Sequence, residues 1–580
     1  MTRKSLSYLS VFLPLVGKFA FAQDVPFSPC PLLGPRFPIA RNLSASTVIQ
    51  SGFKNLTDAL DDYVASLNGT FGPTSSSTSF SIALFSTDSS NSTRPFIYEY
   101  HHTSDTLANA TAGTTKVDGD SVYRVGDLTT LFTTWLFLTE AGEQHWEDPV
   151  SKWVPELVEA TQNLDRFSAV NWNEVTLGDL AAHLGGIGHF ASSYADPRVA
   201  SLLEGFSNST SRSPCQLGSS LCDRKEFLAY FGKHSSVFAP GTTPIFSNAG
   251  YIILAFALES ITGRSYNELL KSSILEPLNM SSTSYLQPPD INNTVIPANL
   301  TSAQWSSANP IEGPYNGLYS NVHDISTGLR AILSSSLISH ATTHRWLKPV
   351  SHTSNLVNSI GRPWEIYSLT ATPISPVIPV YQVRGNVGLY SSHIGLVPDY
   401  DVGFVILAAD SEVNPDLNAY ADIISIAMLP ALEQNAIVSA SKAFAGTYVS
   451  ASNTSIVIAQ AEDSSPGLSL TSFKSSHKDV RAVYAELNDI SPENLSFRLY
   501  PTNTAEEKEK GKKMAFRASF QDVTELADAG TPTCDTWRYI DQLQVNGVGL
   551  DEFIFEMEGD QAVGVTVPAL NATFVKQARA

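Results

Sequence analysis

The chain has 580 residues, more than one domain usually contains, and this length predicts one large domain with a smaller one. Only 16% of the residues are charged, and the formal net charge is −20. Because nucleic acids and anionic membranes bind positively charged surfaces, we expect neither of them as a partner.

The first 22 residues have the pattern of a secretory signal peptide. Two basic residues precede the apolar stretch 6–16, which is too short to span a membrane, and Ala20-Phe21-Ala22 is a small-x-small cleavage site. No later segment is expected to span a membrane, since the apolar run 251–258 is also short. The mature protein is therefore expected to be soluble and secreted, in the secretory pathway or outside the cell.

A high density of Asn-x-Ser/Thr sequons accompanies this signal. In a chain that enters the secretory route, such a density predicts an N-glycoprotein. The predicted glycosylation sites are Asn42, Asn55, Asn68, Asn91, Asn109, Asn208, Asn279, Asn292, Asn299, Asn453, Asn494 and Asn571.

Four cysteines, Cys30, Cys215, Cys222 and Cys534, are an even number, which predicts a disulfide framework in that compartment. A bond between Cys215 and Cys222 would close a small loop and leave Cys30 to link the N-terminal segment to the C-terminal domain. Three pairings are possible, and the sequence does not choose among them. A catalytic thiol is the weaker interpretation, because no cysteine stands beside a histidine in a motif.

Residues 122–432 alternate helical and strand-like segments. Apolar residues at helical spacing predict helices over 131–141 and 251–261, each ending near a glycine. A β-branched and aromatic run predicts a strand over 402–408. Helices mixed with an antiparallel sheet predict an α/β (α+β) architecture.

Beyond residue 440 the pattern changes to that of a separate, smaller all-β domain, with short alternating stretches between Ser/Gly/Asn/Asp-rich turns. The charge-dense run 506–513 is mixed in sign and is interpreted as a solvated loop. We divide the chain into a signal peptide, residues 1–22, a larger domain, 23–437, and a C-terminal β-rich domain, 438–580.

Several segments between residues 115 and 430 occur in the order of one family's landmarks. They are YRVG followed by LFT at 123–133, DPVSKWVP at 148–155, HLGGI at 183–187, PG and SNAGY at 240–251, NGLYS at 316–320 and VPDY at 397–400. This series resembles the serine β-lactamase/penicillin-binding-protein-like family, related to class C β-lactamases. Residues 30–31, 534–537 and 551–553 resemble its fungal-type secreted subgroup, which adds a C-terminal β-domain.

The resemblance implies a β-lactamase/transpeptidase-like fold, with an antiparallel sheet flanked by helices and an all-α subdomain. It also implies an acyl-transfer site. In this family a serine at a helix start attacks an acyl carbonyl, a lysine three residues later takes the proton, and a Tyr-x-Asn loop and a strand cation complete the site.

At the family's reactive positions this chain carries other residues. Asp127 stands at the serine position, Thr130 at the lysine position and Phe246 at the tyrosine position, while Asn248 keeps the amide. Val383 stands at the position of the strand cation. Loss of a nucleophile leaves roughly 10³–10⁴-fold catalysis over water in a well-studied triad, so we expect no acyl-serine chemistry.

Each substituted position has more than one interpretation. Asp127 is either a general acid/base or carboxylate nucleophile, or an N-cap of the following helix, and we prefer the cap. Arg384 is a candidate ligand-binding cation in place of Val383, but neighbours on a strand point to opposite faces, which favours a structural role. Asn248 either binds a ligand or holds its own loop.

The histidines are interpreted as structural. His183 is expected to brace a turn and His189 to lie on the surface, although a loop position could bring His189 to the site. His340 and His344 have i,i+4 spacing without an acidic third ligand, so we expect no metal site there. No phosphate-binding glycine loop is present, and we expect no cofactor.

Two classes of function follow. The first is a protein that binds a small acyl-type or natural-product ligand without acyl-serine chemistry. The second is an enzyme of secondary metabolism that uses the same site, with Asp127 as acid or base, as a cyclase, isomerase, dehydratase or weak hydrolase. In both cases the expected partner is a small molecule.

Overall fold

The computed structural model describes residues 27–88, 96–161, 169–190, 222–306, 309–369, 377–450, 454–459, 465–475, 478–508, 511–525 and 534–578. By compactness the chain divides into a larger unit, residues 39–371 with 377–436, and a smaller unit that joins the segment ending at Pro38 to the residues from Ile437 onward. The boundary expected between residues 437 and 438 lies one residue from this division. The described residues 27–38, expected in the larger domain, instead group with the C-terminal unit.

Within the described residues, an eight-stranded antiparallel sheet forms the centre of the larger unit. Ile82 and Ile406 lie opposite each other although 324 positions of sequence separate them. Every residue of the three central strands β3, β12 and β13 is buried, because helices cover both faces of the sheet. The strands, from edge to edge, are β4 (Tyr98–His102), β3 (Ser79–Ser86), β13 (Val402–Ala409), β12 (Tyr390–Val397), β11 (Ile378–Val387), β10 (Glu365–Leu369), β9 (Asn358–Ile360) and β8 (Ser351–His352).

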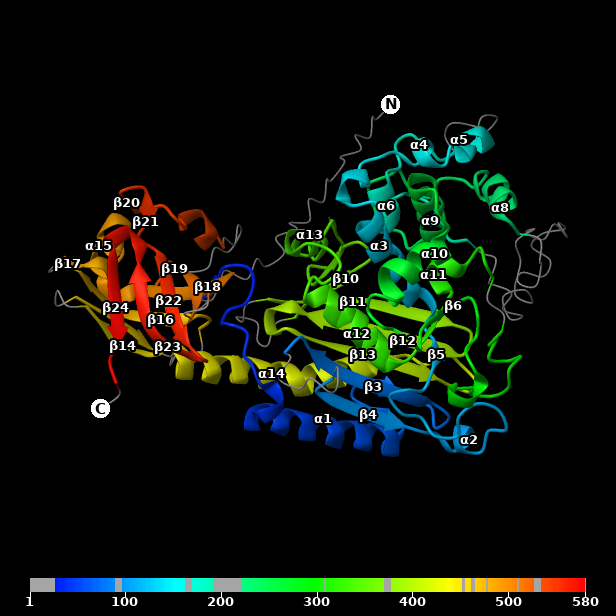
Figure 1. The fold of residues 1–580 in the computed structure, drawn as a ribbon, viewed down its shortest axis with the longest axis horizontal. Helices are drawn as coiled ribbons and strands as arrows, with labels where there is room; N and C mark the ends of the chain where they lie inside the picture. Colours follow the sequence, from blue (N-terminus) through cyan, green and yellow to red (C-terminus); the bar gives the residue numbers. More distant parts are fainter. Residues whose placement is uncertain are drawn as a thin grey trace, which may run out of the picture. The chain divides into compact units, whose positions relative to one another are not determined.

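One face of this sheet is covered by a group of helices that includes α3 (Thr129–Glu140) and α9 (Asn248–Thr262) (Figure 1). Ser247 starts α9 by accepting a hydrogen bond from the Gly250 N–H, and Gly263, with φ of 71°, ends it. Both helices expected from periodicity are confirmed. Apart from α1 and α14, the other helices in the described residues of this unit are α2 (Asp105–Ala108), α4 (Val150–Trp153), α5 (Glu156–Thr161), α6 (Leu177–Ala181), α8 (Arg224–Phe231), α10 (Tyr266–Leu270), α11 (Gly313–Asn316), α12 (Val322–Leu333) and α13 (His340–Trp346).

The opposite face is covered by α1 (Thr47–Ser66) and α14 (Asn418–Phe444), which run side by side (Figure 1). Among the described helices, α14 is long and apolar enough to cross a membrane by length and composition, which the sequence analysis did not expect. Core helices of soluble proteins pass the same test, and here Tyr420, Ile424 and Met428 of α14 are buried in the core cluster that includes the sheet.

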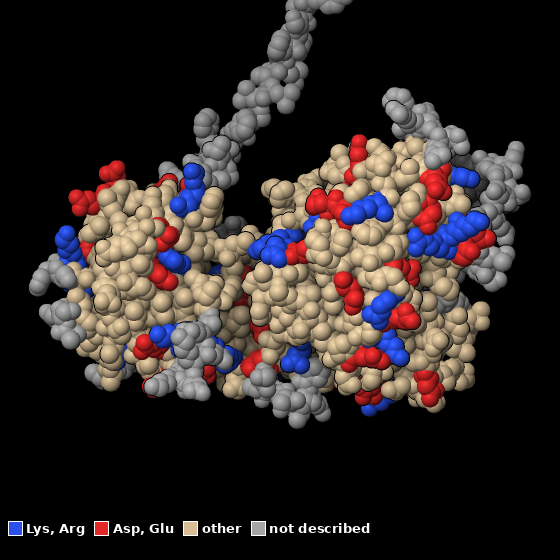
Figure 2. Space-filling view, turned by 45° about the horizontal axis from the view of Figure 1, so that its top comes forward, with Lys and Arg blue, Asp and Glu red and all other residues tan. Residues whose placement is uncertain are grey.

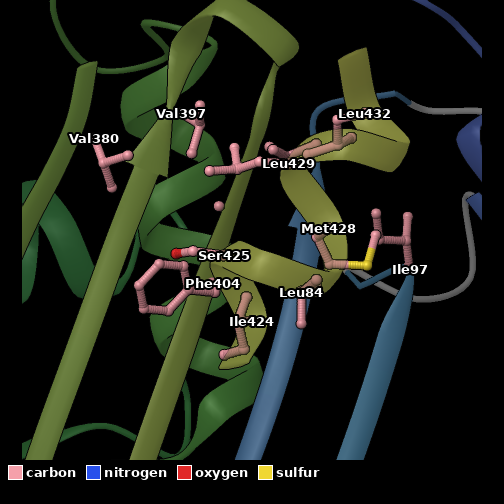
Figure 3. Close-up of a pocket in the computed structure, with 12 residues that line it drawn as sticks. Leu84, Ile97, Val380, Val397, Phe404, Ile424, Ser425, Met428, Leu429 and Leu432 are labelled. Carbon is pink, nitrogen blue, oxygen red and sulfur yellow. The ribbon is translucent and has the colours of Figure 1, made fainter. Parts of the chain in front are cut away.

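A small apolar cavity lies between the sheet and α14 (Figure 3). Val380, Val397 and Phe404 line it from the strands, and Met428 and Leu432 line it from the helix. Its volume of about 30 Å³ is far below that of a small-molecule site. Since the lining offers water almost no polar partner, this cavity is a packing gap rather than a binding site.

A second, three-stranded sheet leads the chain into the first landmark segment. Within it β7 (Leu318–Ser320) pairs with both β5 (Tyr123–Arg124) and β6 (Ser284–Tyr285). Tyr123 and Arg124 are both buried, and Tyr123 shares a hydrogen bond of 3.1 Å with Ser81 of β3. The entrance to α3 is thereby attached to the central sheet.

The smaller unit contains a nine-stranded antiparallel sheet in its described residues, and an extra pairing of β15 with β16 closes it into a barrel. Phe444, Phe516 and Phe555 fill its interior with ring centroids 5.0–5.2 Å apart. The expected smaller β-domain is confirmed, with one unexpected helix, α15 (Val480–Leu487). The strands are β14 (Gly446–Val449), β15 (Ser455–Ala459), β16 (Leu468–Ser475), β17 (Lys478–Asp479), β18 (Leu495–Lys508), β19 (Gly511–Asp522), β22 (Glu552–Glu558), β23 (Gln561–Val567) and β24 (Ala572–Lys576).

The described positions of the charge-dense run 506–513 do not form a loop, contrary to our interpretation. Positions 506–508 belong to β18 and positions 511–513 to β19, with 506 opposite 513 and 507 opposite 512 in the strand register. On the face of the molecule shown in Figure 2, lysine and arginine side chains are interspersed with aspartate and glutamate.

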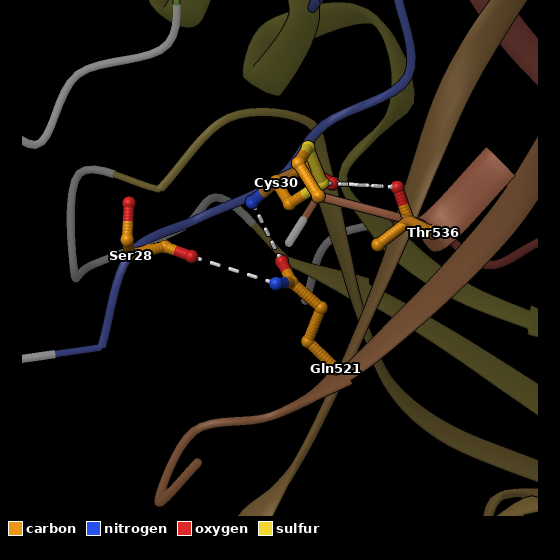
Figure 4. Close-up of a disulfide and its surroundings, with 5 residues drawn as sticks. Ser28, Cys30, Gln521 and Thr536 are labelled. Carbon is orange, nitrogen blue, oxygen red and sulfur yellow. Dashed lines mark hydrogen bonds between the residues drawn. A yellow bond between two sulfur atoms is a disulfide. The ribbon is translucent and has the colours of Figure 1, made fainter. Parts of the chain in front are cut away.

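A disulfide between Cys30 and Cys534 lies within the smaller unit (Figure 4). The Cys30 N–H donates to Gln521 Oε1 at 2.8 Å, and the Thr536 hydroxyl donates to the Cys30 carbonyl at 2.8 Å. These bonds explain why the N-terminal segment belongs with the C-terminal unit. Cys222 is also disulfide-bonded, and Cys215, one of the partners that the sequence left open for it, lies outside the described residues.

Candidate functional site

A short 3-10 turn, η2 (Gly126–Leu128), brings Asp127 against the end of β11. Gly126 adopts φ of 58°, and a Cβ there would come within 2.6–2.9 Å of the Asn386 backbone. Gly385 is equally restricted, because its Cβ would lie 2.5 Å from both the Val125 carbonyl oxygen and the Leu128 nitrogen. Two glycines thus permit η2 and β11 to make backbone contact.

The carboxylate of Asp127 is half-buried and points to that strand. Its Oδ2 accepts a hydrogen bond of 3.2 Å from the Asn386 N–H. Burial raises the pKa of Asp127 to about 7, although backbone hydrogen bonds from Asn386 and from its own N–H act to lower it, and the charge of Glu312 adds to the rise. Among the described residues, no cation acts on this carboxyl. It therefore exchanges its proton near neutral pH.

The interpretation of Asp127 as a helix N-cap is wrong. The residue preceding α3 is Leu128, and no side chain caps the helix start. Instead the Thr129 and Thr130 hydroxyls donate to the carbonyls of Gly126 and Asp127, at 2.8 and 2.7 Å. Because η2 already continues into helical geometry, the carboxylate faces β11 rather than the first N–H groups of α3.

Thr130 is buried and lies one turn into the helix from Asp127. Its hydroxyl is engaged with the Asp127 carbonyl, so it has no basic group to offer. Four residues on, Thr134 contacts Tyr251 of α9, whose hydroxyl donates to the Ala181 carbonyl at 2.9 Å. The two helices that carry the predicted motifs are therefore neighbours.

Phe246 lies just before α9 and is 42% exposed. Its ring stacks on His183 at 4.8 Å between centroids, and the His189 ring lies 5.2 Å away. His183 adopts φ of 60°, and its Nδ1 accepts a hydrogen bond of 3.2 Å from the Ser247 N–H. Burial, with the nearby His189, lowers the pKa of His183 to about 4, so this ring is neutral at physiological pH. His183 braces the turn, and His189 is exposed beside Phe246.

Asn248 is committed to its own loop. Its Oδ1 accepts from the Phe190 N–H at 2.7 Å, and its Nδ2 donates to the Phe190 carbonyl at 3.2 Å. The Ser247 hydroxyl donates to the Gly188 carbonyl at 2.8 Å. Of the two interpretations left open, the geometry supports loop holding, and a ligand role stays a prediction.

Val383 and Arg384 lie on opposite faces of β11. Val383 is 4% exposed and belongs to the core cluster shared with α3, on the same face as Gly385. The Arg384 guanidinium instead pairs with Glu365, with Nε 3.1 Å from Oε2, and reaches Asn418 of α14 at 3.4 Å. Arg384 therefore does not face Asp127 and does not replace a cation at Val383.

Two buried polar residues near Asp127 were not expected from the sequence. Glu312 accepts hydrogen bonds from the Asn316 amide at 3.1 Å and the Asn309 amide at 3.4 Å. Arg124 donates to the Gln304 carbonyl at 2.7 Å and lies over the Tyr319 ring at 5.6 Å, and burial lowers its pKa. Only the position of Arg124 inside the YRVG segment could have drawn attention to it.

The edge of the site near Phe246 is apolar. Val237 and Phe238 are 49% and 45% exposed, and their N–H groups both reach the Gly186 carbonyl in the same loop network as His183. Val237 also lies against Gly188, where an added Cβ would be 3.2 Å from its side chain.

No group of three or more His, Cys, Asp or Glu side chains with a metal-binding arrangement occurs in the described part of the chain. The His340 and His344 rings lie 6.4 Å apart on α13.

Most predicted glycosylation sites that the structure describes are exposed, namely Asn42, Asn55, Asn68, Asn109, Asn279, Asn292, Asn299 and Asn571. Asn494 is half-buried, while Asn91, Asn208 and Asn453 lie outside the described residues.

Comparison with protein families agrees with the division of the chain. A family model described as "Beta-lactamase" matches residues 98–427, more than half of the chain. A second model, "Beta-lactamase-like-like, C-terminal domain", matches residues 436–578. Together they cover the barrel and most of the larger unit, but not α1 and β3, which precede residue 98.

Individual proteins show the same similarity. A "Beta-lactamase-like protein" of Arthroderma benhamiae is 28% identical over 590 aligned residues, covering 94% of this chain and 96% of that protein. "Probable hydrolase M10" of Phoma sp. is 28% identical over 381 residues, covering 62% of this chain and 60% of that protein. Among solved structures, a class C beta-lactamase superposes with a TM-score of 0.45 and 15% identity, covering 67% of this chain and 99% of that one.

Proposed function

Because the chain belongs to the beta-lactamase family, we propose that it binds a small molecule at the family's acyl-transfer site without forming an acyl-serine intermediate. The observation that carries this proposal is Asp127, which stands at the start of η2 where the resemblance places the nucleophile. A carboxyl group in this position cannot form the serine ester on which the family's chemistry depends.

The side chains at the family's other reactive positions support binding over acyl transfer. The Thr130 hydroxyl is engaged with a backbone carbonyl, and Phe246 has no proton to transfer. Phe246 instead offers exposed apolar surface beside two histidines. A ligand with an aromatic or apolar body and a polar group near Asp127 matches this arrangement.

We further propose that the protein acts in the secretory pathway or outside the cell. A disulfide between Cys30 and Cys534 indicates an oxidising compartment. Exposed sequons and the expected signal peptide support the same route.

Intact mass spectrometry tests the loss of acyl-serine chemistry. The secreted, deglycosylated protein is incubated with a fluorophosphonate and with a β-lactam, beside the triple variant Asp127→Ser/Thr130→Lys/Phe246→Tyr. We expect no adduct on the wild type and one adduct on the triple variant, at the serine introduced in place of Asp127. An adduct on a single serine of the wild type would overturn the proposal, because another nucleophile would then be present.

A second candidate function is general acid–base catalysis by Asp127, and the raised pKa of this carboxyl favours it. A group with a pKa of about 7 is well matched to proton transfer at neutral pH, which typically accelerates a reaction 10²–10⁴-fold. The reaction would be a cyclisation, isomerisation or dehydration of a small natural product, or a weak hydrolysis by an activated water.

Measuring whether the protein converts a substrate distinguishes ligand binding from acid–base catalysis. If Asp127 acts as base, the rate should rise with pH through about 7, and Asp127→Asn should abolish it while Arg384→Ala leaves it unchanged. Saturable binding that Phe246→Ala weakens, with no turnover by the wild type, would instead support the binding function alone.

A further inference from the structure

A groove runs between α1 and α14 on the face of the larger unit away from Asp127. It has a volume of about 500 Å³, within the range of small-molecule sites, and none of its lining residues is charged. Ile426 on α14 is 63% exposed and Phe71, beyond the end of α1, is 40% exposed. We call this depression the α1–α14 groove.

Small side chains determine where the two helices touch. A Cβ on Gly52 would lie 2.9 Å from the Cβ of Ala431, so the helices are in close contact at this point. Nearby, the Ser46 hydroxyl donates to Asn435 Oδ1 at 2.6 Å. On the outer side of this contact the helices leave apolar surface uncovered, which in a soluble protein marks a place where something binds.

The wall of this groove contains a glycosylation sequon, Asn55-Leu56-Thr57. Leu56 is fully buried, and the Thr57 hydroxyl is shared with Tyr98 at 2.9 Å. Asn55 is exposed, lines the groove, and is in the middle of α1. Of the three sequon residues, Asn55 therefore presents its side chain to the groove.

We propose that the N-glycan attached to Asn55 occupies the α1–α14 groove, with its first sugar residues lying over Ile426 and Phe71. Sugar rings present C–H faces that pack on aliphatic and aromatic side chains, while their hydroxyl groups stay in water. Because the glycan is covalently bound to the wall, its effective concentration at the groove is of the order of millimolar even if each contact is weak. The groove then carries its own ligand.

This inference is independent of the chemistry at Asp127 and requires only passage through the secretory route. Two other occupants are conceivable for an uncharged groove, a second copy of the chain and a lipid surface. Neither is needed when a covalent substituent is already anchored in the wall, and both are distinguished below.

The test uses Asn55→Gln beside Asn292→Gln, both produced as secreted full-length protein. Asn292 is an exposed sequon in η6 (Ile291–Asn293) that does not line the groove. Glutamine favours a helix interior slightly more than asparagine, so propensity alone predicts a small rise in Tm for Asn55→Gln. We expect a fall of about 2–4 °C instead, and no comparable fall for Asn292→Gln.

Two readouts show whether the sugar covers Ile426. Binding of an apolar fluorescent dye should increase in Asn55→Gln but not in Asn292→Gln. In the double variant Asn55→Gln/Ile426→Ser the dye signal should return to the wild-type level, and the Tm effects of the two changes should not add.

Three results would overturn the proposal. Glycopeptide mapping that finds Asn55 unmodified removes the occupant. Equal Tm and dye binding in Asn55→Gln and Asn292→Gln show that the sugar does not touch the groove. Light scattering that finds a dimer dissociated by Ile426→Ser, or binding of the wild type to phosphatidylcholine vesicles lost in the same variant, assigns the groove to the other occupants.

Discussion

Two half-buried carboxylates in the larger unit have opposite environments. Within the described parts of the chain, Asp127 accepts hydrogen bonds from backbone N–H groups and from no side chain, and burial raises its pKa to about 7. Glu99 on β4 is also partly buried, but hydrogen bonds from His101 and His323 outweigh that burial and lower its pKa to about 2. A buried carboxylate without a cation costs stability when charged, whereas one with cations contributes stability.

Glu99, Asp120 and His323 form a cluster of ionisable side chains that joins elements distant in sequence. His323 of α12 lies 2.8 Å from Glu99 and 2.9 Å from Asp120, and its ring stacks on Phe96 at 4.7 Å. Burial alone would lower the pKa of His323, but the two carboxylates raise it above its usual value. Glu99 is thus held in its charged form by two histidines, whereas the charged form of Asp127 is destabilised by burial.

The largest effect is expected from Gly385→Ala, which separates Asp127 from its strand. A Cβ at this position would meet two backbone atoms at 2.5 Å, so η2 or β11 must move. Overpacking against backbone should lower the free energy of unfolding by about 3 kcal/mol. Chemical denaturation measures it, and Gly241→Ala, whose Cβ has open space but whose φ is positive, controls for backbone strain alone. Equal losses of unfolding free energy in the two variants would contradict the close backbone contact between Gly385 and η2.

Asp127→Asn should stabilise the protein at high pH. Because the folded pKa is raised, the native state holds this proton more tightly, and stability falls as pH rises from about 4 to about 7. After allowance for partial exposure, the variant should gain about 2 kcal/mol over the wild type at pH 8 and little at pH 4. Asp62→Asn, exposed on α1, serves as the control. A gain that does not depend on pH would contradict the raised pKa.

His323→Gln should destabilise the protein most in mildly acidic solution. The raised pKa of His323 means that its contribution is complete below about pH 6.5 and is lost as pH rises through the folded value. We expect a loss of about 1.5 kcal/mol at pH 5.5 and a smaller loss at pH 8.5. Denaturation at both values, with the exposed His352→Gln as control, measures the difference. A larger loss of unfolding free energy at pH 8.5 would contradict the raised pKa of His323.

Arg384→Ala should have the smallest effect. Its ion pair with Glu365 is 33–45% exposed at the side chains, and pairs of this kind contribute about 0.5 kcal/mol or less. Ligand binding should be unchanged, because the guanidinium lies on the face of β11 away from Asp127. Weakened ligand binding in this variant, with stability retained, would show instead that Arg384 contacts the ligand.

Much of the fold could be predicted from local patterns. Helices 131–141 and 251–261 and strand 402–408 follow from periodicity and from glycine or proline at their ends, which act over a few residues. The strand positions within the run 506–513 were not predicted, because a polar run shows no apolar alternation and the register of β18 with β19 is set by pairing between two strands.

The sequence by itself determined the family, the order of the landmark segments and the identity of the residues at the reactive positions. Only the tertiary structure decided what those residues do, because hydrogen-bond partners and burial depend on chain segments far apart. It directed the Asp127 carboxylate to β11 instead of a helix cap, committed Asn248 to Phe190, and turned Arg384 away. It likewise placed Asn55 in the wall of the α1–α14 groove, since helices separated by some 350 residues form that groove.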